Sequence, residues 1–229
     1  MTFLKKYLGD KMKISGAIFD MDGTLYLGDQ LYPFTKELLT EIRNTGGQYL
    51  FMTNNSSKSV LDYVRKLDKL GIPANRDDFM TSSQATAYYL KKHHAGQVLY
   101  VCGTESLKTE LRNEGFTVSD NLDEIQCIVM GFDTELTFKK LEDVSKLLLL
   151  RPDIPYIATN PDLVCPVSFG YVPDCGSVAI MLKNATGKYP TFIGKPEPSM
   201  INFVMKKYGY TKEETAVIGD RLYTDILSA

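Results

Sequence analysis

Two aspartates one residue apart close a short apolar run near the beginning of the chain. The segment 16–24 reads GAIFDMDGT, and a brief apolar run bounded by turn-forming residues is typical of a buried strand. Because side chains alternate between the faces of a strand, Asp20 and Asp22 are expected to point the same way. Two carboxylates on one face repel each other unless a cation or a shared proton compensates. The pair therefore predicts a metal site that takes part in catalysis. The structural alternative is an ordinary Asp-Gly turn at the end of a strand.

Three further polar signals stand where apolar runs end. They are Thr53-Asn54-Asn55 after residues 48–52, Lys195 after residues 192–194, and Asp220 with Asp225 after residues 215–218. In an open parallel sheet, ligands bind at the carboxyl ends of the strands. All four signals are therefore predicted to converge on one edge of a sheet.

Each signal taken alone has an ordinary structural interpretation. The Thr53 hydroxyl and the Asn54 backbone N–H suit a phosphate oxygen at a helix start, but an N-cap uses the same residue types. Lys195 stands in a Gly-Lys-Pro turn, where a lysine is usually a surface residue. Asp225 falls in the first turn of an expected helix, where the helix dipole favours an acid without any metal. Their convergence is what favours the functional interpretation.

The elements that must position these residues alternate between strand and helix. Residues 32–45 and 57–70 have helical spacing and flank an apolar strand over 48–52. The same alternation continues along the chain, which predicts an α/β fold with a parallel sheet and crossover helices. The further predicted helices cover 82–94, 105–114, 136–150, 176–186 and 198–208, and the further strands cover 98–102, 125–131, 155–158, 192–196 and 215–218.

The middle of the chain carries the strand–helix pattern without phosphate-type motifs. We therefore predict a core domain built from residues 1–81 and 182–229, with residues 82–181 inserted as a second domain. Residues 160–175, rich in Pro, Gly and Asp, are predicted to form a long functional loop or an irregular hairpin. Asp162, Tyr171 and Asp174 in this loop are candidates for substrate contact.

Composition excludes several function classes. The formal net charge is −2, which gives no electrostatic case for binding nucleic acid or an acidic membrane surface. The four cysteines lack metal-ligand spacing and lie in or near apolar runs, so buried thiols in a reducing cytoplasm are expected. Because no clean apolar run precedes the first strand, neither a signal peptide nor a membrane span is expected in residues 1–13. Met12 is a hypothetical natural start, with the first eleven residues disordered.

The motifs taken together resemble the haloacid dehalogenase superfamily of phosphatases. The D-x-D-G-T opening, a strand-terminal Thr, a Lys and a G-D-x-x-x-x-D pair occur in the superfamily's order. The segments DMDGTLY, MTNNS, ATNPD, IGKPEP and GDRLYTD are similar to those of the subfamily of NagD, para-nitrophenyl phosphatases and pyridoxal-phosphate phosphatase. The resemblance implies a Rossmann-like parallel-sheet core with an inserted α/β cap domain.

The same resemblance implies a role for each candidate residue. Asp20 would attack phosphorus and Asp22 would act as general acid and base, while Thr53, Asn54, Asn55 and Lys195 would bind the phosphoryl group. Mg²⁺ would be held by Asp20, the Asp22 carbonyl, Asp220 and Asp225. An acid at position 22 also argues against dehalogenase chemistry, which needs no leaving-group acid.

The expected activity is Mg²⁺-dependent hydrolysis of a small phosphorylated metabolite, with homodimers formed through the cap. A phosphotransferase or mutase is one alternative, although relatives of that kind carry a small helical cap. A non-enzymatic receiver-like module phosphorylated on Asp20 is another, although receivers need no acid at position 22. The subfamily continues beyond Asp225 with a fuller helix and another strand, so the second part of the core is expected to be truncated at Ala229.

Overall fold

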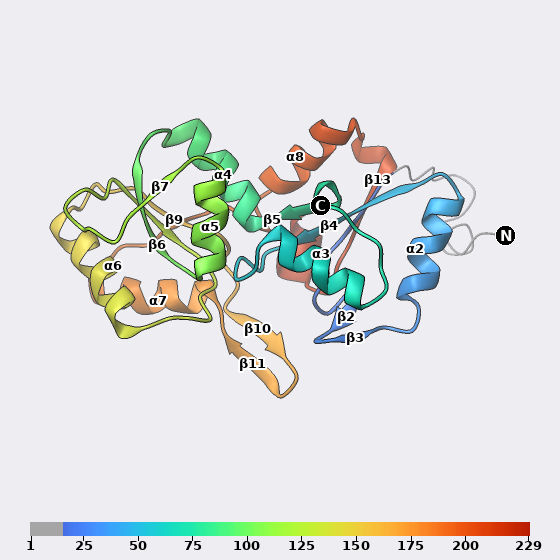
Figure 1. Cartoon of the computed structure of the whole chain (residues 1–229), viewed down its shortest axis with the longest axis horizontal. Coiled ribbons are helices and arrows are strands. Elements are labelled where there is room, and N and C mark those ends of the chain that lie inside the picture. The colour runs from blue at the N-terminus through green and yellow to red at the C-terminus, as the bar shows by residue number, and fades with distance from the viewer. Residues whose placement is uncertain (1–15) are drawn as a thin grey trace. The chain divides into compact units, whose positions relative to one another are not determined.

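The structure, a computed structural model, describes residues 16–229 and divides into two compact units (Figure 1). The hypothetical start at Met12 lies outside the described residues. The first unit takes the described part of residues 1–53 together with Val60–Met80 and Pro198–Ala229, and the second takes Asn54–Ser59 and Thr81–Glu197. Each unit has its own parallel sheet, and the two are described in turn.

The first unit is built on a sheet with the strand order β13-β1-β4-β5. Strand β1 (Gly16–Phe19) runs parallel to both of its neighbours, β13 (Thr215–Ile218) and β4 (Gln48–Thr53). A central strand between parallel neighbours is the arrangement that directs several loops to one sheet edge. The remaining elements are β2 (Tyr26–Leu27), β3 (Gln30–Leu31), α2 (Thr35–Asn44), α3 (Val60–Lys69), η1 (Arg76–Asp78), β5 (Phe79–Thr81), α8 (Ser199–Tyr208), η2 (Lys212–Glu214) and the π-helical segment η3 (Leu222–Ile226).

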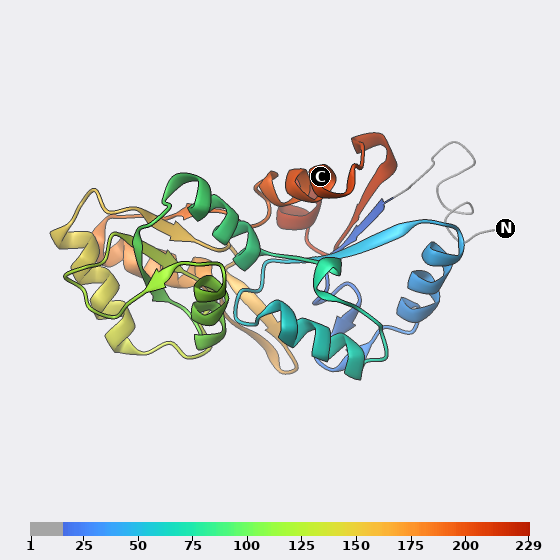
Figure 2. The same ribbon diagram turned by 45° about the horizontal axis from the view of Figure 1, so that its top comes forward.

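Helices α2 and α3 cover one face of this sheet. Both are amphipathic and pack buried residues against Phe19 of β1 and Phe51 of β4. In Figure 2, α8 lies on the opposite side of the sheet, where its inward side is buried. The sheet is therefore covered on both faces, which explains why β1 is apolar and buried along its whole length. The buried apolar and aromatic residues of these helices are Leu39 and Ile42 of α2, Val60, Tyr63 and Leu67 of α3, and Met200, Ile201 and Val204 of α8.

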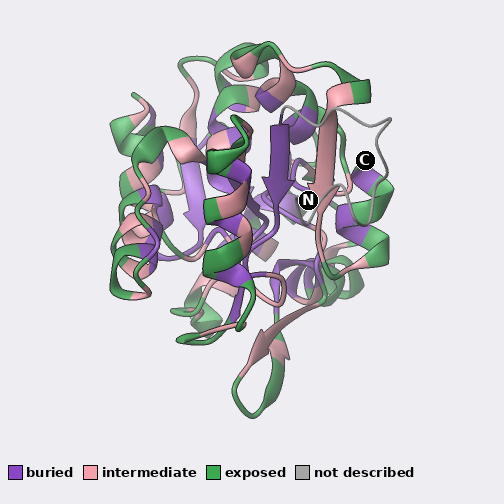
Figure 3. Ribbon diagram, turned by 90° about the vertical axis from the view of Figure 1, so that its right-hand side faces the viewer, coloured by how far each residue is buried: buried purple, intermediate pink, exposed green. Residues whose placement is uncertain are grey.

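The second unit contains a five-stranded sheet in the order β12-β9-β8-β6-β7, with every pairing parallel. Helices α6 and α7 pack their apolar sides on one face, against β6 and β8. The core of this unit includes Tyr100 and Cys102 of β6 and Ile128 and Met130 of β8. Figure 3, which views the chain from the side of the first unit, shows buried residues on strand β1 and on the inward sides of helices. The strands are β6 (Val98–Cys102), β7 (Thr117–Val118), β8 (Cys127–Met130), β9 (Tyr156–Ala158) and β12 (Thr191–Phe192), and the helices are α4 (Ser82–His93), α5 (Glu105–Asn113), α6 (Phe138–Leu150) and α7 (Cys175–Thr186).

A two-stranded antiparallel hairpin projects from the second unit between β9 and α7 (Figure 1). It consists of β10 (Val164–Val167) and β11 (Gly170–Pro173), paired from Val164↔Pro173 to Val167↔Gly170. Phe169 and Tyr171 near its tip are 80% and 69% exposed. The predicted irregular hairpin over residues 160–175 is thus a regular hairpin framed by shorter loops.

The α/β class and the parallel sheets predicted from the alternation are confirmed, whereas the boundaries of the two units differ from the predicted domain limits. Strand β12 pairs with β9 in the second sheet, with Thr191 opposite Ile157. A limit at residue 181 would also cut through α7, whose buried residues belong to the core of the second unit. The first unit therefore resumes only after Glu197.

Three of the four cysteines are buried as free thiols. Burial raises the pKa of Cys102 and of Cys127 to about 12, since a thiolate is poorly solvated in an apolar core. Burial also raises the pKa of Cys175. These thiols behave as small apolar core residues, and Cys165 in the hairpin is half-buried. Within residues 16–229, no helix has the length and apolar character required to cross a membrane.

Candidate active site

Neighbouring strands β1 and β13 end side by side and bring two acids to the same sheet edge. Phe19 pairs with Ile218, and the Asp20 N–H continues the ladder by donating to the Ile218 carbonyl at 2.8 Å. Asp20 follows β1 directly, and Asp220 follows β13 after one glycine. The parallel register therefore places the D-x-D and G-D motifs together, although about two hundred residues separate them in the chain.

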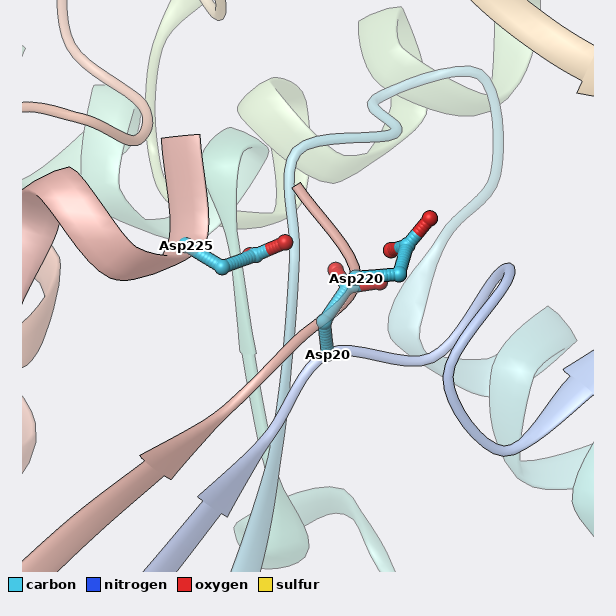
Figure 4. Close-up of side chains that lie close together, drawn as sticks. All are labelled: Asp20, Asp220 and Asp225. Carbon is cyan, nitrogen blue, oxygen red and sulfur yellow. The ribbon is translucent and has the colours of Figure 1, made fainter. Parts of the chain in front are cut away.

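Asp20, Asp220 and Asp225 form one cluster of carboxylates (Figure 4). Each offers an oxygen, and these oxygens lie within 4.8 Å of one another. Asp225 is 1% exposed and Asp20 is 9% exposed, while Asp220 is open to solvent. Two buried carboxylates this close to a third are costly without a cation among them.

Backbone contacts hold Asp225 in the cluster. Its Oδ2 accepts a hydrogen bond from the Arg221 N–H at 3.1 Å, and its own N–H donates to the Arg221 carbonyl at 2.9 Å. The Ser228 hydroxyl donates to the Asp225 carbonyl at 2.9 Å. The short π-helical turn η3 thus presents this carboxylate inward while its neighbours Leu222 and Tyr223 remain exposed.

Two glycines are required by the close approach of the acids. Gly23 has φ +93°, and a Cβ there would lie 2.6 Å from Asp220 Oδ2. A Cβ on Gly219 would lie 2.3 Å from the Asp225 Cγ. A side chain at either position would push a carboxylate out of the cluster, which gives the glycines of both motifs a physical reason.

The donor set fits a small hard cation. Mg²⁺ prefers oxygen ligands at about 2.1 Å in an octahedron, which puts ligand oxygens about 3 to 4 Å apart. The clustered carboxylates offer three such oxygens at nearly this spacing. They supply neither sulfur nor imidazole, so the site does not resemble a zinc site.

Asp22 is placed differently from the prediction that it shares a strand face with Asp20. Strand β1 ends at Phe19, and the chain then turns, with the Leu25 N–H donating to the Met21 carbonyl at 2.9 Å. The alternation of a strand therefore no longer applies at position 22. The Asp22 carboxylate is not one of the three clustered acids, and its Oδ1 lies 3.4 Å from Lys66 Nζ.

Lys66 of α3 is a neighbour of the site that the sequence did not indicate. Its ammonium lies 3.8 Å from the centre of the Tyr26 ring as well as near Asp22, and its side chain is 15% exposed. The cation–π contact and the ion pair anchor α3 to the turn after β1. Forty-four residues separate Lys66 from Asp22, and no motif marks the lysine in the sequence.

Thr53 is the last residue of β4 and is 3% exposed. Since Phe51 pairs with Phe19, Thr53 extends past β1 at the same edge of the first sheet as the acids. The structure thus gathers Asp20, Asp22, Thr53, Asp220 and Asp225 at the carboxyl end of this sheet.

Asn54, Asn55 and Lys195 belong to the second unit, where the Asn54 side chain is hydrogen-bonded to the main chain of Lys195. The Asn54 Oδ1 accepts from the Lys195 N–H at 2.8 Å, and its Nδ2 donates to the Lys195 carbonyl at 2.9 Å. Lys195 is 2% exposed. Asn55 uses its side chain locally, because its Oδ1 accepts from the Ser57 N–H at 3.0 Å and from the Ser57 hydroxyl at 2.7 Å.

Two of the hairpin-region candidates for substrate contact face inward. Asp162 and Asp174 are 2% and 4% exposed, and both accept a hydrogen bond from the Asn160 side chain at 3.1 Å. Asp174 also begins α7 as its N-cap. Tyr171 on the hairpin remains exposed. The acids of this region are therefore internal polar groups of the second unit.

Comparisons with known proteins agree with this geometry. Residues 17–117 match the model of the haloacid dehalogenase-like hydrolases, and residues 192–229 match a second model described as HAD-hydrolase-like. An acid sugar phosphatase of Staphylococcus epidermidis is 33% identical over 211 residues, which cover 92% of this chain and 80% of that protein. The chain belongs to the haloacid dehalogenase-like hydrolases. An acid sugar phosphatase of Staphylococcus aureus is 32% identical over the same shares of both chains.

Solved structures place this hydrolase in the NagD-like group. The 4-nitrophenylphosphatase of Thermotoga maritima is 38% identical with a TM-score of 0.88, and the match covers 94% of this chain and 81% of that one. A structure described as a NagD protein is 37% identical with a TM-score of 0.88, covering 96% and 85%. A glycerol phosphate phosphatase of Mycobacterium tuberculosis, solved with magnesium, is 29% identical with a TM-score of 0.85, covering 93% and 64%. The family, fold and enzyme class predicted from the motifs are confirmed: the chain is a phosphoric monoester hydrolase.

Proposed function

We propose that this hydrolase cleaves small phosphate monoesters with Mg²⁺ through an aspartyl-phosphate on Asp20. The observation that carries the proposal is the carboxylate cluster at the end of β1, whose oxygens lie within 4.8 Å of one another. Burial of a carboxylate among other carboxylates at the end of a central strand is destabilising, so it indicates a functional role. We propose two roles for Asp20, as the nucleophile and as a metal ligand.

Asp20, Asp220 and Asp225 would hold the ion through their carboxylates, and Asp22 through its main-chain carbonyl. When bound, Mg²⁺ would screen the repulsion between the attacking carboxylate and the phosphate oxygens. Asp225 is anchored by the Arg221 backbone, which supports its role as a fixed ligand. Asp220 is exposed, and its Oδ1 accepts a hydrogen bond from the Thr24 hydroxyl at 3.4 Å.

The chain's own residues would perform two displacements. An Asp20 oxygen attacks phosphorus while the bond from phosphorus to the ester oxygen breaks, and that oxygen leaves with the bonding electrons and takes a proton from Asp22. A water molecule then attacks the phosphorus and gives its proton to Asp22. The bond to Asp20 breaks, and the carboxylate is restored with release of inorganic phosphate.

Thr53, the Asn54 and Asn55 segment and Lys195 would bind the transferring phosphoryl group. A hydroxyl, backbone N–H groups and an ammonium complement the charge on its oxygens. The fixed main chain of Lys195 supports a preorganised cation.

The substrate is proposed to be a small phosphorylated metabolite such as a sugar phosphate. The support comes from relatives named acid sugar phosphatase, 4-nitrophenylphosphatase and glycerol phosphate phosphatase. Release of phosphate from a panel of sugar, polyol and nucleotide monophosphates tests this class directly, and activity confined to nucleotides would contradict it. The cap role of the inserted domain, pairing through it and a cytoplasmic location stay predictions.

Replacing Asp22 by Ala is expected to affect poor leaving groups more than good ones. An alkoxide leaves only when it is protonated, whereas 4-nitrophenolate leaves without help. We expect kcat for glycerol phosphate to fall by about 10²- to 10⁴-fold. For 4-nitrophenyl phosphate, we expect a much smaller decrease in the rate constant of the first displacement. Burst-phase release of 4-nitrophenol isolates that displacement. Equal losses of phosphorylation rate on both substrates would show that Asp22 is not the leaving-group acid.

A further inference from the structure

A buried hydrogen-bonded network surrounds the main chain of Lys195 in the second unit. It links three loop segments, which follow β4, β9 and β12 in the chain. Asn54 follows β4, Asp162 follows β9, and Lys195 follows β12. All three residues are nearly inaccessible, with exposed fractions of 8%, 2% and 2%.

The Asn54 carboxamide is fully used within this network. Its Oδ1 accepts the Lys195 N–H at 2.8 Å, and its two amide hydrogens go to the Lys195 carbonyl at 2.9 Å and to Asp162 Oδ2 at 2.7 Å. Its main-chain carbonyl accepts from the Ser82 hydroxyl at 2.7 Å. Asn54 therefore contacts the Lys195 peptide units on both sides of the residue.

Asp162 decides which way this carboxamide faces. An ionised carboxylate is an acceptor only, so the group that contacts it must be the Asn54 amide nitrogen. A flipped carboxamide would put its oxygen against Asp162 and the Lys195 carbonyl, and its nitrogen against the Lys195 N–H. All three hydrogen bonds would be lost in a buried site, where unpaired polar groups are costly.

Asp162 is itself held from behind. Asn160 Nδ2 donates to Asp162 Oδ2 at 3.1 Å, and Asn160 Oδ1 accepts from the Thr159 hydroxyl at 2.8 Å. The residue before Lys195 is fixed by the same segment, because the Gly194 N–H donates to the Thr159 carbonyl at 2.8 Å. A Cβ at Gly194 would lie 2.5 Å from that carbonyl oxygen and 2.6 Å from Asn54 Oδ1. The Gly-Lys turn is thus fitted to this network.

We infer that Asp162, acting through Asn54, is a positioning residue that fixes the main chain of Lys195 for phosphoryl transfer. The inference rests on the proposed function, in which Lys195 binds the phosphoryl group. It assigns the buried acid of the ATNPD segment to the reaction without contact between that acid and the substrate. A displacement of about 1 Å in a positioning group lowers turnover by about 100-fold.

The decisive variant is Asp162→Asn, which keeps the volume and removes the acceptor-only carboxylate. We expect kcat on 4-nitrophenyl phosphate to fall by about 10- to 100-fold, with KM changed by a smaller factor. The control is Asp143→Asn, because Asp143 is another buried acid of the same unit, 7% exposed and bonded to the Tyr100 hydroxyl at 3.1 Å. Its turnover is expected to remain within about twofold of the parent enzyme.

A double-mutant cycle separates positioning from general destabilisation. In a Lys195→Ala background, Asp162→Asn is expected to cause no further loss of kcat, since there is no ammonium left to place. If Asp162→Asn does not fold, a cycle of Asn54→Ser with Lys195→Ala tests whether the loss of kcat caused by disrupting the network depends on the Lys195 side chain. The unfolding temperature of each variant is measured beside its kcat.

The outcomes distinguish the inference from the function on which it rests. Parent-like kcat in Asp162→Asn, or an equal loss with and without the Lys195 side chain, would overturn the positioning role alone. Parent-like kcat in Lys195→Ala would overturn both that role and the phosphoryl contact of Lys195. A loss in Asp162→Asn that disappears in the Lys195→Ala background would establish the coupling.

Discussion

Replacement of Asp20 by Asn is expected to abolish phosphate release from 4-nitrophenyl phosphate. An amide oxygen is a far weaker nucleophile than a carboxylate, and the amide contributes no charge to the metal cluster. Removal of a nucleophile typically costs about four to six orders of magnitude in kcat. Steady-state assays at saturating Mg²⁺ measure this loss, and the shape of the side chain is unchanged by the substitution.

The control for this variant is Asp68→Asn, which makes the same chemical change on the exposed surface of α3 in the same unit. It is expected to keep parent turnover, because surface substitutions away from special features have small effects. Turnover in Asp20→Asn within tenfold of the parent enzyme would show that another group attacks phosphorus.

Removal of divalent metal is expected to eliminate activity and to leave the protein folded. Without a cation, the three carboxylates repel both one another and the phosphate dianion. We expect EDTA to lower turnover by at least about 10³-fold, because the metal's stabilisation of charge in the transition state, several kcal/mol, is lost. Mg²⁺ should restore it, while Ca²⁺ should restore much less because it takes more ligands at longer distances.

The site of metal action is tested by Asp225→Asn. Asp225 is 1% exposed and lies among the clustered acids, so its loss as an anionic ligand should raise the Mg²⁺ concentration needed for half-maximal activity. EDTA already saturated with Mg²⁺ is the matched control for chelator effects. Full activity after exhaustive chelation would contradict a metal-assisted reaction, and an unchanged Mg²⁺ requirement in Asp225→Asn would remove Asp225 from the site.

Much of the fold was predictable because local signals and topology agree. Apolar runs of strand length alternate with amphipathic helices, and a strand such as β6 has the predicted bounds, Val98–Cys102. The limits of the second unit were not predictable in the same way. Strand β12 has only two residues, and its partner β9 lies more than thirty residues earlier, so the pairing depends on packing rather than on any local pattern.

Site residues that directly follow strands could be predicted from the sequence. Contacts that depend on the packing of helices and loops could not. The convergence of Asp20 and Asp220 follows from parallel strand ends. The contact of Lys66 with Asp22 depends on how α3 packs against the sheet, and the position of Asp162 behind Asn54 depends on three loops meeting in the second unit. The sequence did mark Asp162, but as a substrate contact, because burial of a loop acid has no periodic signal.

The central claim is that Asp20 carries the phosphoryl group between the two displacements. Asp22→Asn should slow the second displacement, and mass spectrometry of acid-quenched, peptic-digested protein then locates any trapped group. After mixing with 4-nitrophenyl phosphate and Mg²⁺, the peptide containing Asp20 is expected to gain the mass of one phosphoryl group and to lose it on treatment with hydroxylamine. Steady release of phosphate with that peptide unmodified, or a phosphoryl group trapped on another residue, would contradict the account.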